Sequence, residues 1–135
     1  MRLSLVILIF FTCSFSNNEI KKNEMTLTYI DCQMNFDRYL TAKDLIYFEP
    51  ISCKINREDY KVIIAEINNN VIDTFRTYLD CRVKLNIKFK NENFQVIFDS
   101  YGHYEFNNQY YSPSKKLNTI LQKYMKKEMC WITIN

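Results

Sequence analysis

Cysteine is the residue type in this 135-residue chain with the greatest chemical potential. Zinc ligands usually come in pairs about two to four residues apart, and the gaps between these cysteines are far longer. A catalytic thiol needs an imidazole base, and His103 is the only histidine. Four cysteines remain when Cys13, close to the N-terminus, is set aside, and an even number of dispersed cysteines in a small domain usually forms disulfides in an oxidising compartment. We therefore expect two disulfides from Cys32, Cys53, Cys81 and Cys130.

Four cysteines allow three disulfide pairings, and their positions on the predicted strands and helices favour one of them. Cys81 is in phase with Val83, which places it on the covered face of a predicted strand. Cys130 follows the last predicted helix, so a Cys81–Cys130 bond would attach that helix to the sheet. Cys32 then pairs with Cys53, and the other two pairings stay open.

Acidic residues offer a second kind of chemistry. Two facing carboxylates can hydrolyse a glycosidic bond, one as general acid and the other as base or nucleophile. The chain has fifteen acids, but no Ser-His-Asp pattern, glycine-rich phosphate loop or zinc signature. We therefore assign no catalytic residue, expect no cofactor or metal, and keep a small secreted hydrolase as the alternative function. Candidates for the pair are Asp31, Asp37, Asp44, Glu49, Asp99 and Glu105.

Basic side chains gather on one face of a predicted strand, at Arg82, Lys84, Lys88 and Lys90. They could contact an acidic partner, although lysines are also common on a solvated sheet face, where they discourage aggregation. The formal net charge is +3 and falls to +2 if Arg2 leaves with a leader. Because nucleic-acid-binding domains are much more basic, no nucleic-acid partner is expected.

Tyrosines are dense between residues 101 and 111. When exposed, they supply a large and fairly rigid contact area for a protein or a sugar. Alternate residues of the same segment could instead fill the core beneath the last helix. The candidate binding surface therefore combines the basic strand residues with Tyr101, Tyr104, Tyr110 and Tyr111.

Residues 1–16 have the pattern of an export signal. Arg2 precedes the apolar run Leu3–Phe11, which is shorter than the roughly 20 apolar residues of a membrane-spanning helix. In one route, signal peptidase cleaves after Ser16. In the other, Phe10–Cys13 resembles the lipobox of bacterial lipoproteins, which implies lipidation of Cys13 and attachment to the membrane through lipid alone. Both routes stay open, and both predict a location outside the cytoplasm.

Composition predicts one folded domain after this leader. The chain is 47% hydrophobic and 24% charged, which at this length supports a single core. We expect a polar tether over residues 17–24 and the domain over residues 25–135. Because glycine occurs once, asparagine is expected to fill many positive-φ turn positions.

The first half of the domain is predicted to contain short elements. Alternation predicts a strand over 25–32, and one or two short strands are expected within 45–55. Residues 60–79 have helical spacing, but β-branched residues and three consecutive asparagines favour a strand at Lys61–Ile67, followed by a helix capped near Asn70. One long helix is the alternative. The buried stripe of the capped helix would be Val71, Ile72, Phe75 and Leu79.

The second half has clearer patterns. Strict alternation over 83–90 and a return over 94–99 predict an antiparallel hairpin, and a further strand or hairpin is expected over 103–111. Ser112 and Pro113 predict the start of an amphipathic helix. The predicted fold class is α+β: a small antiparallel sheet, with its central hairpin at 83–99, covered by this C-terminal helix and a second helix.

These patterns favour a small exported or lipid-anchored envelope protein. Its expected role is non-catalytic, as a protein-binding or inhibitor-like domain that meets another envelope or extracellular protein. The secreted hydrolase with paired carboxylates remains the alternative.

Overall fold

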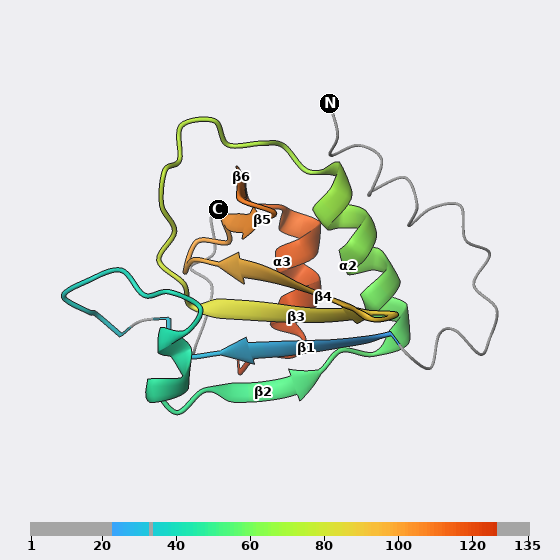
Figure 1. Ribbon diagram of the computed structural model, residues 1–135, viewed down its shortest axis with the longest axis horizontal. Coiled ribbons are helices and arrows are strands. Elements are labelled where there is room, and N and C mark those ends of the chain that lie inside the picture. Colours follow the sequence, from blue (N-terminus) through green and yellow to red (C-terminus); the bar gives the residue numbers. More distant parts are fainter. Residues whose placement is uncertain (1–22, 33, 127–135) are drawn as a thin grey trace.

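The computed structural model describes residues 23–32 and 34–126, which are built around one antiparallel sheet (Figure 1). The sheet has six strands in the order β2-β1-β3-β4-β5-β6. Both helices, α2 (Arg57–Asn69) and α3 (Lys115–Gln122), lie on the same face of the sheet. The predicted α+β class is therefore confirmed. The strands are β1 (Glu24–Tyr29), β2 (Ile51–Lys54), β3 (Val83–Phe89), β4 (Glu92–Phe98), β5 (Tyr104–Phe106) and β6 (Gln109–Tyr111).

The central hairpin forms as predicted, because β3 and β4 pair from Val83↔Phe98 to Phe89↔Glu92. The apolar residues of β3 are buried beneath the helices, whereas its polar residues lie on the open face. Asparagine also takes the expected turn positions: Asn107 and Asn108 have φ of 53° and 60° between β5 and β6. Two consecutive positive φ values suit the tight turn of a hairpin.

Helix α2 occupies the segment for which a strand was predicted. Asn56 caps the helix by accepting a hydrogen bond from the Asp59 amide at 2.8 Å, and Ile63 and Ile67 are buried against the sheet. Burial of this apolar stripe outweighs the strand preference of β-branched residues. The prediction of a strand at Lys61–Ile67 is wrong, and so is the single long helix, because Asn70 is already extended.

The segment after α2 is not helical. The predicted stripe of a helix starting near Asn70 is exposed at Val71, Ile72 and Phe75, and only Leu79 is buried. That prediction is therefore wrong as well, because helical spacing alone does not provide a surface against which the stripe can be buried.

Helix α3 covers the sheet as predicted but begins later. Its cap is Ser114, whose hydroxyl accepts a hydrogen bond from the Leu117 amide at 3.1 Å, rather than Ser112. Leu117, Ile120 and Leu121 enter the same core as the buried residues of α2.

A second, smaller core lies beside this one. It consists of Ile30, Leu40, Leu45 and Cys81, and it is covered by the segment that contains the short 3-10 helix η2 (Asp44–Tyr47).

The predicted cysteine pairing is wrong. Cys53 and Cys81 are both free, so neither the Cys32–Cys53 nor the Cys81–Cys130 bond exists. Cys81 instead fills space in the smaller core with no exposed surface, as a small apolar residue would. Cys32 is not a free thiol, but its partner is neither Cys53 nor Cys81. Cys13 and Cys130 lie outside the described residues, as do the predicted export signal and most of the predicted tether.

Candidate functional site

Residues 70–82 form a long connection from α2 to β3, with an isolated bridge at Ile72 as its only regular structure. Figure 1 shows this connection arching beyond the β6 edge of the sheet. Connections of more than about 12 residues without regular structure are uncommon and often functional. This connection is the 70–82 loop.

The start of the loop is bound to β6 by backbone hydrogen bonds. The Asp73 amide donates to the Tyr110 carbonyl at 2.9 Å, and the Ser112 amide donates to the Val71 carbonyl at 2.9 Å. The Asn70 side-chain amide also donates to the Ser112 carbonyl at 2.8 Å. The loop thus continues the sheet beyond β6.

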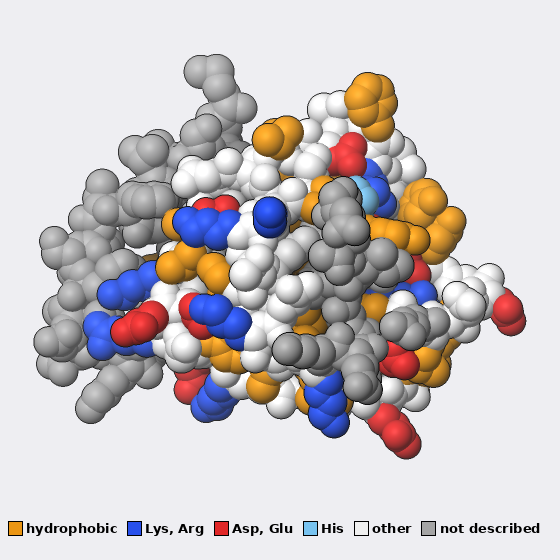
Figure 2. All heavy atoms as spheres, turned by 180° about the vertical axis from the view of Figure 1, so that it is seen from behind, with side chains coloured by type: hydrophobic (Ala, Val, Ile, Leu, Met, Phe, Trp, Pro, Cys, Tyr) orange, Lys and Arg blue, Asp and Glu red, His pale blue; other side chains and the backbone are white. Residues whose placement is uncertain are grey.

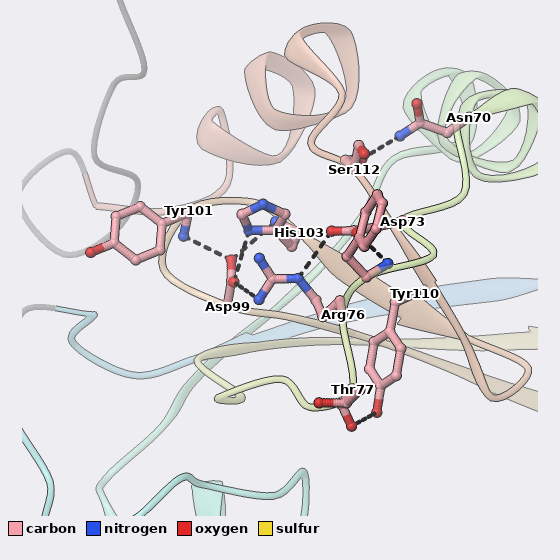
Figure 3. A network of polar contacts seen from close by, with 10 residues as sticks. Asn70, Asp73, Arg76, Thr77, Asp99, Tyr101, His103, Tyr110 and Ser112 are labelled. Carbon is pink, nitrogen blue, oxygen red and sulfur yellow. Dashed lines mark hydrogen bonds and ion pairs between the residues drawn. The ribbon is translucent and has the colours of Figure 1, made fainter.

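Arg76 attaches the middle of the loop to the turn that follows β4 (Figure 3). Its Nε lies 3.3 Å from Oδ2 of Asp73, and its Nη1 lies 3.4 Å from Oδ2 of Asp99. Desolvation opposes the charged form of Asp73, but hydrogen bonds from the Phe75 amide and the Arg76 side chain outweigh it, so the pKa of Asp73 is lowered. Arg76 therefore bridges two carboxylates.

Asp99 organises the turn on the other side of this bridge. Its buried carboxylate accepts hydrogen bonds from the amides of Tyr101 at 2.9 Å and His103 at 3.0 Å, and lies 2.9 Å from Nδ1 of His103. Gly102 completes the turn at φ 85°, and an added Cβ there would collide with the Asn118 side chain of α3. The turn that receives Arg76 is thus itself held against the rest of the domain.

The loop presents apolar side chains to solvent although its backbone is anchored. Phe75 is 94% exposed, and the Tyr78 ring stacks on Tyr39 with centroids 4.3 Å apart. Figure 2 shows hydrophobic side chains projecting near His103, the pale blue residue. We call this set the aromatic loop surface; it comprises Tyr39, Val71, Ile72, Phe75 and Tyr78, all exposed.

An exposed group of this kind suits contact with another molecule rather than internal packing. Apolar patches on soluble proteins commonly mark interaction sites, and aromatic residues dominate the binding energy of protein interfaces. Thr77, next to this surface, accepts a hydrogen bond at its carbonyl from the Tyr110 hydroxyl at 3.2 Å. The loop is therefore held at its start, middle and far side.

The predicted tyrosine surface is only partly present. Tyr101 is exposed, but Tyr104 is fully buried, stacks on Tyr111 at 4.8 Å and donates to the Ile67 carbonyl at 3.3 Å. Tyr110 and Tyr111 are half-buried. Because residues of β5 and β6 alternate, Tyr104 and Tyr111 face the helices and cannot belong to a binding surface.

The predicted basic strand face is also divided. Arg82 is buried, pairs with Asp80 at 2.6 Å and lies over the Phe36 ring at 4.6 Å, so it does not belong to a binding face. Lys84 and Lys88 lie on the open face of β3, and Lys90 lies in the turn after it. These lysines occupy a solvated polar face, which does not by itself indicate a partner.

Several carboxylates of the described residues are held by neighbouring cations or hydrogen-bond donors. Asp44 is held by Arg38 at 2.7 Å, which with the Thr41 hydrogen bonds keeps its pKa far below the ordinary value. The pKa of Asp59 is lowered mainly by the Tyr124 hydroxyl. The pKa values of Asp44, Asp59 and Asp73 are all lowered, whereas a general acid needs a raised pKa. These three carboxylates are therefore unsuited to act as a general acid.

Residues 23–32 and 34–126 contain neither a membrane-spanning helix nor a metal-binding cluster. No helix there is long and apolar enough to cross a membrane. Within the same residues, no cluster of His, Cys, Asp or Glu could hold a metal ion.

Periodicity does not reveal the aromatic loop surface, because Val71, Ile72 and Phe75 have the spacing of a buried helical stripe. One signal was present: the run Asn68–Asn70 is a poor helix interior and marks the end of α2. Comparison with known proteins adds nothing to this assignment, because no family model, curated protein or solved structure matches the chain.

Proposed function

We propose that this protein is a small exported, non-catalytic binding domain that attaches to another envelope or extracellular protein through the aromatic loop surface. The observation that carries the proposal is Phe75, which is 94% exposed on a loop anchored to two parts of the sheet. A large aromatic side chain presented in this way is suited to insert into a pocket of a partner.

The anchoring of the loop is favourable for affinity. A flexible loop loses conformational freedom when it binds, and this loss opposes association. Here the hydrogen bonds of Asp73 and the bridge through Arg76 order the backbone before any partner arrives. The binding energy of Phe75 and Tyr78 is therefore available for the contact itself.

The chemistry of the surface indicates an apolar partner site. Asp73 and Asp99 both pair with Arg76 at the base of the loop, so these three charges are already engaged with one another. The exposed atoms are those of aromatic rings and the aliphatic side chains of Val71 and Ile72. We expect the partner to offer an apolar pocket with a polar rim, as is usual at protein interfaces.

The location of this function rests on residues 1–16. Their basic start and apolar run support export, by cleavage after Ser16 or by lipidation of Cys13. Lipidation would hold the domain at a membrane surface, with lipid as its only membrane contact. Cleavage would release it into the periplasm or the medium.

Site-specific photo-crosslinking in the native cells tests the proposal. A photoreactive phenylalanine analogue replaces Phe75 in one strain and Tyr47 in a control strain, since Tyr47 is 75% exposed on η2, outside the aromatic loop surface. We expect a discrete crosslinked protein from position 75 and none from position 47. Equal crosslinking from both positions, or none from position 75, would contradict the proposal.

A further inference from the structure

A cavity of about 200 Å³ opens where β1 begins, β2 ends and α2 starts. It lies at the opposite end of α2 from the 70–82 loop, so it is separate from the aromatic loop surface. Met25, Ile55 and the ring of Tyr60 give it an apolar lining. The backbone beneath it is fixed, because the Ile55 amide donates to the Met25 carbonyl at 2.9 Å.

The rim of the cavity is predominantly basic. Lys54, Arg57 and Lys61 line it together with one acid, Glu24, whose carboxylate lies 3.5 Å from Lys54. Within the described part of the chain, Arg57 and Lys61 make no ion pair. Figure 2 shows Lys and Arg side chains gathered at this end of the molecule. The first turn of α2 adds the positive end of a helix dipole.

Tyr60 lines the cavity next to Lys61. Its hydroxyl is buried and has no hydrogen-bond partner among the described residues, although its side chain lines the cavity. Burial raises the pKa of Tyr60 to about 12, because the charged phenolate is disfavoured there. Because this hydroxyl has almost no accessible surface, a bound molecule would contact the ring of Tyr60.

We propose that this cavity binds a small carboxylate with an apolar body, with the charge facing Arg57 and Lys61. The volume sets the size of that body: an apolar cavity of roughly 150 Å³ holds one benzene ring. The cavity of about 200 Å³ therefore accommodates a single ring or a short alkyl chain with its carboxylate, and excludes a long acyl chain.

Titration of the isotope-labelled protein with benzoate, followed by amide NMR, tests this site. Benzyl alcohol is the matched uncharged probe. We expect saturable shifts confined to the amides around Met25, Ile55 and Lys61, with benzyl alcohol about fivefold weaker, as loss of partly exposed charge contacts implies. Absence of a saturable shift, or equal binding of the two probes, would overturn the proposal.

Variants that remove the basic side chains at the rim provide a second test of the site. The double variant Arg57→Gln/Lys61→Gln should weaken benzoate binding about five- to tenfold and leave benzyl alcohol unchanged. Lys88→Gln is the matched control, because Lys88 lies on the open sheet face outside this cavity. Unchanged benzoate affinity in the double variant would refute the charge contact. Binding that occurs only after deletion of residues 1–22 would show that the chain itself fills the cavity, and the proposal would be wrong.

Discussion

Nη1 of Arg76 lies 3.4 Å from Oδ2 of Asp99, and this ion pair connects the 70–82 loop to the turn after β4. Asp99 is 5% exposed, whereas the loop that carries Arg76 also carries the most exposed aromatic residue of the described chain, Phe75. A buried carboxylate thus helps to position the loop that exposes Phe75.

Arg76→Ala should loosen the loop without unfolding the domain. Asp99 keeps its contacts with His103 and two backbone amides, so we expect a loss of about 1–2 kcal/mol in the free energy of unfolding. Hydrogen exchange should accelerate at the Phe75 amide, which donates to the Asp73 carboxylate. Arg38→Ala is the control: its pair with Asp44 is more exposed to solvent, so its loss should destabilise the protein less than Arg76→Ala does. Equal costs for both variants would contradict a special role for Arg76.

Phe75→Ala should separate binding from stability. Because Phe75 is almost fully exposed, its truncation should change the free energy of unfolding by no more than about 0.5 kcal/mol. Affinity for the crosslinked partner should fall by about 2 kcal/mol or more, as for a central interface residue. Tyr104→Ala, which removes a fully buried ring, should instead cost about 3–5 kcal/mol of stability. Chemical denaturation and a binding titration measure the two effects, and a large stability loss in Phe75→Ala would argue for a packing role.

Cys53 and Cys81 should differ in their reactivity toward an alkylating reagent. Burial raises the pKa of the Cys81 thiol to about 12 and also raises that of Cys53, which is less buried. The thiolate is the reactive form, so both should react slowly near pH 8, and Cys53 should react first. In denaturant both should react rapidly. Peptide mass spectrometry follows the labels, and rapid alkylation of Cys81 in the folded protein would show that the smaller core is open.

Asp44 should contribute to stability at neutral pH and cease to do so in acid. Arg38 and Thr41 hold its folded-state pKa below the ordinary value of 3.8. Its contribution is therefore complete above that value and is lost as the pH falls below it toward the folded-state pKa. Thermal unfolding of Asp44→Asn should show a lower Tm at pH 7 and a smaller difference from the parent protein near pH 2. A constant difference across this range would contradict the assignment.

Local patterns predicted those elements whose neighbours in the chain are also their neighbours in space. The hairpin of β3 and β4 followed from alternation and a short turn, and the apolar stripe of α3 followed from its spacing. Asparagines at Asn107 and Asn108 took the turn positions expected in a chain with one glycine. These features depend on contacts between residues that are close in sequence, so local patterns are sufficient to predict them.

The location of the candidate site could not be predicted in this way. Val71, Ile72 and Phe75 have the spacing of a buried stripe, but they are exposed because the chain after Asn70 binds to β6 instead of continuing α2. The predicted disulfide of Cys81 was wrong for a related reason. The alternation of the strand shows that Cys81 is on a covered face, but it does not show which side chains pack around it.

The sequence by itself determined the α+β class, the central hairpin, the C-terminal helix and the pattern that predicts export. Only the tertiary structure decided which apolar residues are buried and which face solvent. The physical reason is that burial depends on the surface brought opposite a residue by distant parts of the chain, whereas periodicity records only which residues share a face.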